Sequence, residues 1–316
     1  MTDPLPAALQ LCPFSSYLET ALAQRFEVIR WFTLSEPERS TWLAEKAPTV
    51  RAVITGGHVG CSNALMAALP ALGIIAINGV GVDRVDLPFA RSRGVRVGTT
   101  PGALTDDVAD LAVGLIIGLL RAIPAADAYV RAGAWLKGDK PLARKVTGRR
   151  FGVVGLGHIG AALAARLTAF GEVAYTGPRP KSVPFAYHPD LLSLARACSV
   201  LILTLPASAA TRHLVNDAVF DALGPEGYLI NVARGSLVDE QALIAALRDG
   251  RLAGAALDVY EDEPNVPEAL RQRPNVVLTP HMASATVETR TRMADVVLLN
   301  IDACLRGEPE PHLDYP

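Results

Sequence analysis

The stretch Phe151-Gly152-Val153-Val154-Gly155-Leu156-Gly157-His158-Ile159-Gly160 places three glycines, Gly155, Gly157 and Gly160, directly after a short apolar run. A helical, alanine-rich pattern follows over residues 161–170. In such a strand–loop–helix unit the first glycine permits the tight turn, and the second lets the backbone approach a pyrophosphate. The third lets the helix pack closely on the strand. The order therefore predicts a dinucleotide-binding loop at a helix N-terminus, where free N–H groups face the phosphates.

Short apolar runs alternate with helical patterns on both sides of this loop, which is typical of βαβ units and a parallel sheet. Predicted strands occupy residues 9–12, 28–31, 52–55, 74–78 and 95–98, and then 151–154, 173–175, 200–204, 228–231, 255–258 and 276–279. The second set is what a complete dinucleotide-binding (Rossmann) domain requires. We therefore predict an α/β protein with two doubly wound parallel-sheet domains. Residues 1–100, completed by the C-terminal helical segment 284–316, form the substrate domain, and residues 101–283 form the cofactor domain.

A long apolar segment, residues 105–132, lies between the two sets of strands. Asp106, Asp107 and Asp110 in its first turns favour a helix N-terminus. Apolar residues then cover nearly every face, which predicts a helix that is buried all round and that Pro124 kinks or divides. A helix this apolar between two domains favours a subunit interface over the central helix of a monomer.

Composition excludes several classes of function. The 316 residues are 50% hydrophobic and 20% charged, with a net charge of −2, so there is material for a large core and no basic surface for nucleic acid. The four cysteines form no C-x-x-C pair, which argues against a zinc site or a disulfide framework and suits a reducing cytoplasm. The N-terminus lacks a signal-peptide pattern, and the most apolar run is too short for a bilayer. We expect a cytoplasmic protein with no metal, membrane or nucleic-acid partner.

The choice of cofactor depends on the end of the strand that follows the glycine loop. A carboxylate there binds the ribose 2′-hydroxyl of NAD(H). The sequence instead has Tyr175-Thr176-Gly177-Pro178-Arg179-Pro180-Lys181. Arg179 and Lys181 are suited to a 2′-phosphate through charge-assisted hydrogen bonds, so NADP(H) is favoured. If both are merely solvated loop charges, NAD(H) remains possible.

Three polar residues follow successive predicted strands: Arg234, Glu263 and His281. Ligands of open α/β sheets bind outside the carboxyl ends of the strands, so these side chains are expected to converge. An arginine holds a carboxylate and polarises a carbonyl, and a histidine delivers a proton near neutral pH. A carboxylate on the other ring nitrogen fixes the tautomer and favours the imidazolium. Each residue alone more often has a structural role, but together they predict reduction of a 2-oxo acid.

With these residues the chain resembles the D-isomer-specific 2-hydroxyacid dehydrogenase family, particularly its glyoxylate/hydroxypyruvate reductase and hydroxyphenylpyruvate reductase branch. The resemblance covers nearly the whole chain. Its motifs are Gly79-Val80-Gly81-Val82-Asp83-Arg84-Val85-Asp86, Gly98-Thr99-Thr100-Pro101-Gly102, Leu104-Thr105-Asp106-Asp107-Val108-Ala109-Asp110, the glycine loop, Asn231-Val232-Ala233-Arg234-Gly235, Leu257-Asp258-Val259 and Pro280-His281. An asparagine usual before the threonine-proline pair is missing here. The resemblance implies the Arg234, Glu263 and His281 roles, with Glu263 chosen because it precedes Pro264.

The resemblance also implies further contacts. Backbone amides at Val80-Gly81 would hold the substrate carboxylate, the loop with Gly57 and His58 would close over the substrate, and Ser284 would line the pocket. Trp135 would reach the partner's active site or only pack at the interface. Positions expected to contact the cofactor are Thr105, Leu156, His158, Ile159, Leu205, Pro206, Val232, Ala233, Arg234, Asp258 and His281. A homodimer built on helix 105–132, and an active site in an interdomain cleft that closes on binding, are implied as well.

These patterns predict an NADPH-preferring reductase that converts glyoxylate, hydroxypyruvate or a related small 2-oxo acid to a D-2-hydroxy acid. A larger 2-oxo acid, such as 2-ketogluconate or an arylpyruvate, is the alternative. Formate or phosphite oxidation is a second enzymatic alternative, but formate enzymes pair the histidine with glutamine, and Glu263 disfavours them. A nucleotide-sensing corepressor would add a tail or a disordered arm, and the sequence shows neither.

Overall fold

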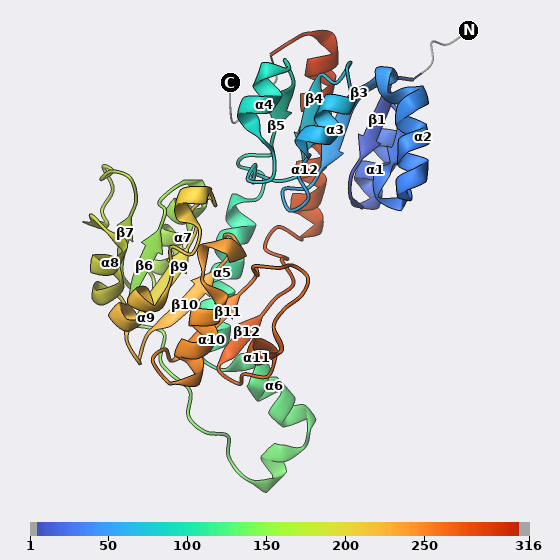
Figure 1. Cartoon of the computed structure of the whole chain (residues 1–316). Helices are drawn as coiled ribbons and strands as arrows, with labels where there is room; N and C mark the ends of the chain where they lie inside the picture. Colours follow the sequence, from blue (N-terminus) through green and yellow to red (C-terminus); the bar gives the residue numbers. More distant parts are fainter. Residues whose placement is uncertain (1–4, 310–316) are drawn as a thin grey trace. The chain divides into compact units, whose positions relative to one another are not determined.

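The computed structural model describes residues 5–309. They form two compact units (Figure 1). Unit 1 consists of residues 5–104 and 284–309, and unit 2 is Thr105–Ala283. The chain thus passes between units at Leu104–Thr105 and at Ala283–Ser284; the sequence placed these crossings at 100–101 and 283–284.

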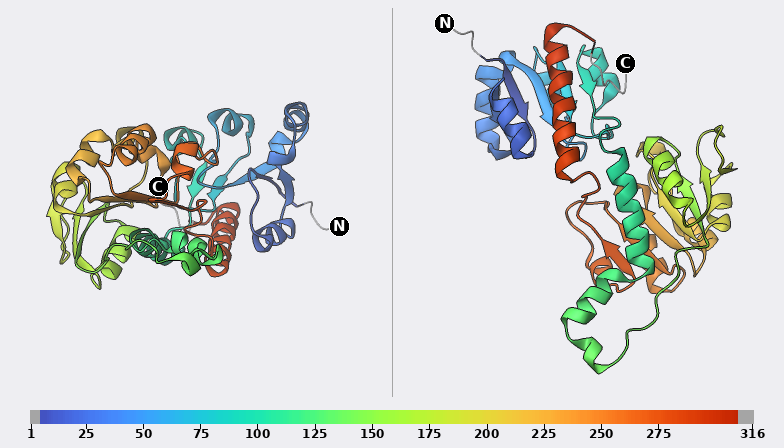
Figure 2. Two further views of the ribbon diagram at one scale, coloured as in Figure 1. Left: turned by 90° about the horizontal axis from the view of Figure 1, so that it is seen from below. Right: turned by 180° about the vertical axis from the view of Figure 1, so that it is seen from behind.

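Unit 1 is built on a five-stranded parallel sheet with the order β2-β1-β3-β4-β5. Its strands are β1 (Ala7–Gln10), β2 (Glu27–Arg30), β3 (Val50–Thr55), β4 (Ile74–Ile77) and β5 (Arg96–Gly98). Helices α1 (Ser16–Ala23) and α12 (Val287–Arg306) pack on one face of the sheet (Figure 2). Helices α2 (Glu36–Lys46), α3 (Asn63–Ala68) and α4 (Leu87–Ser92) pack on the other. Because both faces are covered, the inner strands β1, β3 and β4 are mostly apolar and buried rather than alternating.

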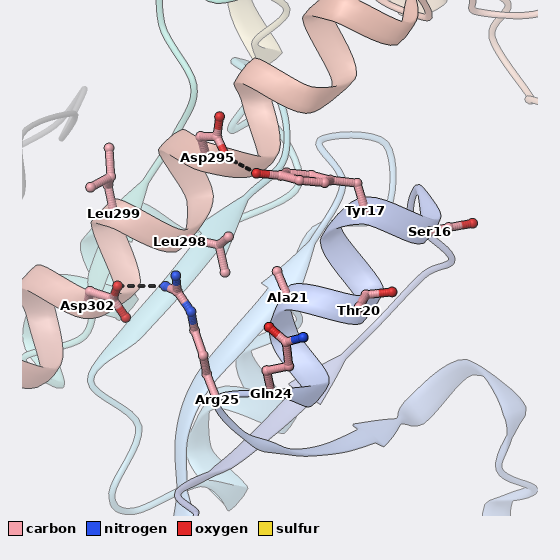
Figure 3. A pocket seen from close by; sticks show the side chains of 10 residues that line it. All are labelled: Ser16, Tyr17, Thr20, Ala21, Gln24, Arg25, Asp295, Leu298, Leu299 and Asp302. Atoms are coloured by element: carbon pink, nitrogen blue, oxygen red, sulfur yellow. Dashed lines mark hydrogen bonds and ion pairs between the residues drawn. The ribbon is translucent and has the colours of Figure 1, made fainter.

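Helix α12 comes from the far end of the sequence and is hydrogen-bonded to α1 and to Arg25, which follows α1. Tyr17 Oη donates to Asp295 Oδ1 at 2.7 Å, and Arg25 Nη1 donates to Asp302 Oδ2 at 2.7 Å. Both contacts cross a groove of about 740 Å³ between the two helices (Figure 3). Beneath them, Val297 and Ile301 enter the core against the sheet. Exposed contacts of this kind contribute little to stability, so the buried apolar face holds the helix in place.

Unit 2 contains a seven-stranded parallel sheet with the order β12-β11-β10-β9-β6-β7-β8. The strands are β6 (Arg149–Val154), β7 (Gly171–Thr176), β8 (Ala186–His188), β9 (Val200–Leu203), β10 (Tyr228–Asn231), β11 (Gly254–Leu257) and β12 (Val276–Leu278). The strand order reverses beside β6, and ligands of such sheets bind outside the carboxyl ends at this switch point.

The sequence predicts six strands in this domain, whereas the sheet has seven, and β8 is the additional one. Only three residues long, β8 is half-exposed at the edge of the sheet and lies between Pro184 and Pro189. Prolines demote a short run to an edge strand at best, so its signal in the sequence is weak.

Helices cover both faces of the second sheet. On one face lie α8 (Leu191–Ala197), α9 (Asp217–Leu223) and α10 (Glu240–Arg248). The other is covered by α5 (Thr105–Leu120) and α7 (His158–Leu167). Two further helices, α6 (Ile123–Arg131) and α11 (Glu268–Arg271), are peripheral.

The predicted helix 105–132 is divided into α5 and α6. The break lies at Ala122, which has the left-handed backbone conformation (φ 50°), and Pro124 stands in the first turn of α6. The prediction that this helix is buried all round is wrong for the single chain: Leu111, Val113 and Ile117 are only partly buried. Between residues 5 and 309 no single helix is long and apolar enough to span a membrane, although α5 and α6 meet that criterion jointly across a 60° bend.

Candidate active site in unit 2

The glycine loop connects β6 to α7, and each of its glycines has the environment that the motif predicts. Gly155 has φ 92°, and a side chain there would meet Leu205 at 2.8 Å. At Gly160 a Cβ atom would lie 2.1 Å from the carbonyl oxygen of Gly155. Gly157, by contrast, has nothing within 4 Å of the position of a Cβ atom. Two glycines therefore permit tight packing, and the middle one leaves open space in front of the loop.

This open space fits the phosphates of a dinucleotide. Gly157 is the N-cap of α7 and supplies no capping side chain, so the first N–H groups of the helix keep their capacity to bind an anion. Gly157 and His158 are exposed. Thr204, which the sequence analysis missed, holds the loop from β9 because its Oγ1 donates to the Gly155 carbonyl oxygen at 2.7 Å.

Two basic side chains follow β7, next to the loop. Lys181 Nζ donates to the carbonyl oxygen of Leu156 at 2.6 Å, which places its charge at the glycine loop itself. Arg179 is exposed, and within residues 5–309 its guanidinium makes no hydrogen bond or ion pair. No carboxylate stands at the end of β7. The arrangement fits NADP(H), with Arg179 available to a 2′-phosphate.

The remaining predicted cofactor positions lie at the same edge of the sheet. Leu205 and Pro206 follow β9, and Val232 and Ala233 follow β10. Thr105 begins α5. Their predicted contacts with the cofactor stay predictions.

His281 and Glu263 form a hydrogen-bonded pair in this unit. His281 Nδ1 lies 2.7 Å from Glu263 Oε2, and since a carboxylate only accepts, Nδ1 carries the proton. Glu263 Oε1 accepts from the backbone N–H of Tyr260 at 3.1 Å. Burial raises the pKa of Glu263, but its hydrogen bond to His281, the charge of His281, the Tyr260 N–H and the charge of Arg234 outweigh burial and hold that pKa below its ordinary value. The carboxylate is therefore ionised at neutral pH.

The backbone of His281 is held in an unusual conformation. Its φ of 49° lies in the left-handed region, which non-glycine residues rarely adopt. The fully buried Asp258 fixes this turn: one carboxylate oxygen accepts from Thr279 Oγ1 at 2.7 Å and Met282 N at 2.9 Å, and the other from Ala283 N at 3.0 Å. Asp258 thus positions His281 through the main chain. Its predicted contact with the nicotinamide carboxamide stays a prediction.

Arg234 lies in the turn after β10, and Asn231 shapes that turn. The Asn231 side chain donates to the carbonyl oxygen of Arg234 at 2.9 Å and accepts from Ala233 N at 3.0 Å. The Arg234 guanidinium is half-buried, and its charge acts on Glu263. Next to it, a Cβ atom on Gly235 would lie 1.9 Å from the carbonyl carbon of Tyr260. Only glycine lets the Arg234 turn pack directly on the segment that bears Glu263.

A cavity of about 330 Å³ adjoins the pair. His281 and Glu263 contribute to its wall together with the apolar Val266 and Leu278. The structure thus brings Arg234, Glu263 and His281 into one region of unit 2, as the sequence predicted. Together, a half-buried cation, an imidazole and a carboxylate can hold an anionic substrate and transfer a proton.

The predicted substrate-binding residues Gly57, His58, Val80, Gly81 and Ser284 belong to unit 1. A Cβ atom on Gly57 would lie 2.9 Å from the carbonyl oxygen of Gly81, so the loops after β3 and β4 pack against each other. Both follow the carboxyl ends of their strands, where ligands of parallel sheets bind. Trp135, in unit 2, is 64% exposed in the single chain. The substrate contacts of these residues stay predictions.

The chain is similar to known proteins in sequence and in fold. Residues 113–283 match the family model described as "D-isomer specific 2-hydroxyacid dehydrogenase, NAD binding domain". The chain is 46% identical to the hydroxyphenylpyruvate reductase of Plectranthus scutellarioides, over 95% of this chain and 96% of that protein. It is also 46% identical to the glyoxylate/hydroxypyruvate reductase A of Arabidopsis thaliana, with the same coverage. A similar solved structure is the NADPH-dependent glyoxylate/hydroxypyruvate reductase of Sinorhizobium meliloti in complex with NADP and malonate, with a TM-score of 0.89 and 41% identity over 97% of this chain and 96% of that one.

Proposed function

The chain belongs to the D-isomer specific 2-hydroxyacid dehydrogenase family, and on that premise we propose that it is an NADPH-preferring reductase of small 2-oxo acids such as glyoxylate and hydroxypyruvate. The observation that carries the proposal is the 2.7 Å contact between His281 and an ionised Glu263, within the electrostatic reach of Arg234. The product is the D-2-hydroxy acid, as expected for this family.

Each residue has a defined part in the reaction. Bound NADPH supplies the hydride that reduces C2 of the substrate. Arg234 holds the substrate carboxylate and draws electron density toward the carbonyl oxygen. Nε2 of the His281 imidazolium donates the proton that this oxygen takes up as the C–O bond becomes single. Glu263 remains on Nδ1 and stabilises the charged ring before the transfer. The reverse oxidation uses neutral His281 as the base.

The cofactor preference rests on the loop that follows β7. This loop carries Arg179 and Lys181 and no acidic residue that could bind a 2′-hydroxyl. The Sinorhizobium meliloti relative is described as NADPH-dependent. NADP(H) is therefore the preferred cofactor, and NAD(H) is usable at lower affinity.

A larger 2-oxo acid is the second candidate substrate. The cavity beside His281 has a volume of about 330 Å³ and a largely apolar wall, which suits an arylpyruvate side chain better than the compact, polar glyoxylate. A 2-ketogluconate would need polar partners for its hydroxyl groups. The relative from Plectranthus scutellarioides is named a hydroxyphenylpyruvate reductase.

A homodimer and a cytoplasmic location are part of the same proposal. The partly exposed apolar residues of α5 and the 93% exposed Leu136 supply a surface for a second copy. All four cysteines lie among the described residues and are free thiols, which supports a reducing compartment.

A panel of 2-oxo acids, assayed with NADPH and NADH in parallel, tests the proposal. We expect turnover of glyoxylate or hydroxypyruvate with NADPH preferred, and phenylpyruvate and 2-ketogluconate measure the alternative. Cofactor binding without consumption of any 2-oxo acid would favour a nucleotide-sensing protein on the same fold and contradict the proposal.

A further inference from the structure

The segment Tyr260–Glu263, which bears the carboxylate partner of His281, is held by Glu240 at the start of helix α10 and by His213 in the loop before α9. Glu240, the first residue of α10, is only 8% exposed, and its Oε1 accepts from the backbone N–H of Glu261 at 3.0 Å. The Glu261 carboxylate in turn contacts His213 Nε2 at 2.8 Å and pairs with Arg212. We call Glu240, Glu261 and His213 the clamp.

The clamp also reaches the turn that bears Arg234. His213 N donates to the carbonyl oxygen of Ser236 at 2.9 Å, and two residues on, Val215 N donates to the carbonyl oxygen of Leu237 at 2.9 Å. The η5 turn (Gly235–Leu237) lies between Arg234 and Glu240. Gly235 packs on the backbone of Tyr260 so closely that no side chain fits. Main-chain contacts thus join the turn that bears Arg234 to the segment that bears Glu263. The clamp residues add side-chain hydrogen bonds to this connection.

Two features of the clamp cost free energy in the folded state. His213 has the left-handed backbone conformation, with φ 51°, which non-glycine residues rarely adopt. Burial raises the pKa of Glu240; the Glu261 N–H opposes this shift, while the charges of Glu261 and Asp262 add to it. A buried carboxylate near two other carboxylates destabilises the fold unless its hydrogen bond compensates for the burial. Costly conformations of this kind gather at functional sites.

Resting on the proposed function, we propose that Glu240, Glu261 and His213 are positioning residues that set the place of Glu263, and hence of His281, relative to Arg234. None of the clamp residues needs to touch the substrate. Without the Glu240 acceptor, the Glu261 N–H loses its partner and the Tyr260–Glu263 segment shifts. A small displacement of a catalytic pair lowers the reaction rate far more than it lowers the affinity for ligands.

The decisive variant is Glu240→Ala, compared with Glu240→Gln and Asp239→Ala. Glu240→Ala should lower kcat on the order of tenfold while the Kd for NADPH stays unchanged. The alkaline decline of its kcat/KM should also begin at a lower pH than in wild type, because the imidazolium loses a well-placed carboxylate. Glu240→Gln keeps an oxygen that accepts the N–H and should restore most of kcat. Asp239→Ala removes the N-cap of the same helix, whose carboxylate accepts from Gln241 N and Ala242 N, and should lower Tm with kcat intact.

His213→Asn gives a second route to the clamp that does not disturb its buried part. Asparagine tolerates the left-handed backbone but lacks the imidazole that reaches Glu261. It should reproduce the loss of kcat and the change in pH profile in a milder form.

NMR spectra of the His281 ring in wild type and in Glu240→Ala provide a readout that does not depend on turnover. We expect the ring resonances to shift in the variant, because Glu263 no longer lies in its wild-type place against Nδ1. If wild type turns over no 2-oxo acid, the proposed function fails, yet these spectra still test the clamp. The clamp is refuted if the His281 resonances, kcat and the pH profile of Glu240→Ala match those of wild type, or if Asp239→Ala changes them equally.

Discussion

At the residue scale, the site depends on how Glu263 stays charged although it is half-buried. Burial alone would favour its neutral form, but His281, the Tyr260 N–H and Arg234 together lower its pKa. The left-handed backbone of His281 is sustained by Asp258, whose two carboxylate oxygens accept three hydrogen bonds from Thr279, Met282 and Ala283. The half-buried Glu263 thus orients the imidazole through its ring, and the fully buried Asp258 orients it through the main chain.

Replacing Glu263 by glutamine should narrow the pH range of activity. In wild type the pKa of Glu263 is below its ordinary value of 4.5, so the carboxylate remains ionised at every pH above that value. In Glu263→Gln the imidazolium has no anionic partner, and the alkaline limb of kcat/KM should move down by about one pH unit. The measurement is the pH dependence of the reduction rate.

The lowered pKa of Glu263 also affects the stability of the fold. A carboxyl group with a lowered folded-state pKa stabilises the fold above its ordinary pKa, and this contribution is lost as the pH falls through the lowered value. Wild type should therefore be more stable than Glu263→Gln at pH 7, and the difference should shrink below pH ~4. An alkaline limb that stays in place would show that Glu263 does not act on His281.

Arg179 should decide between the two nicotinamide cofactors. Arg179→Asp replaces a guanidinium that suits a 2′-phosphate with a carboxylate that suits a 2′-hydroxyl. The preference for NADPH, measured as the ratio of kcat/KM values, should narrow or reverse. Arg196→Asp, at an exposed arginine of α8, makes the same charge change elsewhere and should leave the ratio unchanged. A wild-type enzyme that prefers NADH would contradict the role of Arg179.

At the scale of elements, the glycine loop and the strand ends place the functional groups. Strands β6, β9, β10, β11 and β12 are parallel neighbours, so the loops after them emerge at one edge of the sheet. Thr204 at the end of β9 holds the loop after β6, and Asn231 at the end of β10 holds the turn with Arg234. The regular sheet thus converts positions in the sequence into a common site.

Two alanine substitutions in the glycine loop should separate packing from cofactor binding. In Gly157→Ala the new Cβ atom has no neighbour within 4 Å, so Tm should stay near that of wild type. The added methyl group nevertheless enters the space for the phosphates. Its affinity for NADPH should fall on the order of tenfold, equivalent to about 1.4 kcal/mol. Gly160→Ala, whose Cβ atom would lie 2.1 Å from the Gly155 carbonyl oxygen, should lose both Tm and affinity. Thermal unfolding and NADPH titration measure the two effects; normal NADPH affinity in Gly157→Ala would move the phosphates away from this loop.

The sequence predicts those elements whose signal is local. The glycine loop, the apolar strands and the three polar residues after strands were all found from neighbouring residues. Contacts between distant residues were not found: Asn300 donates to the carbonyl oxygen of Thr99 at 3.1 Å, and a Cβ atom on Gly98 would lie 2.8 Å from the Asn300 side chain. No local pattern links residues that far apart in sequence. Glu240 was missed for the same reason, because nothing in its own segment shows that it holds Glu261.

At the scale of the whole molecule, the surface of unit 2 has apolar side chains that a single chain leaves exposed. Ile123 and Val130 on α6 are 50% and 56% exposed, and they lie two turns apart on the same face of the helix. With the partly buried residues of α5 they form the surface that we assign to a second copy. The periodicity of residues 105–132 could not show this, since an apolar residue covered by its own chain has the same pattern as one covered by a partner.

Sedimentation of the purified protein should therefore give a dimer. Val130→Asp places a charge on the exposed face of α6, where it costs a single chain little but would be buried between two copies. It should shift the protein toward the monomer. Val287→Asp, at an 81% exposed position of α12, is the matched control and should remain dimeric. If wild type is a monomer, the proposed interface is wrong.

The turnover of His281→Gln with NADPH and hydroxypyruvate tests directly whether His281 supplies the proton. Glutamine keeps a polar side chain of similar length but cannot act as an acid, so kcat should fall on the order of a hundredfold or more while NADPH still binds. Near-normal turnover in this variant would mean that His281 does not supply the proton, and the mechanism built on Arg234, Glu263 and His281 would be wrong.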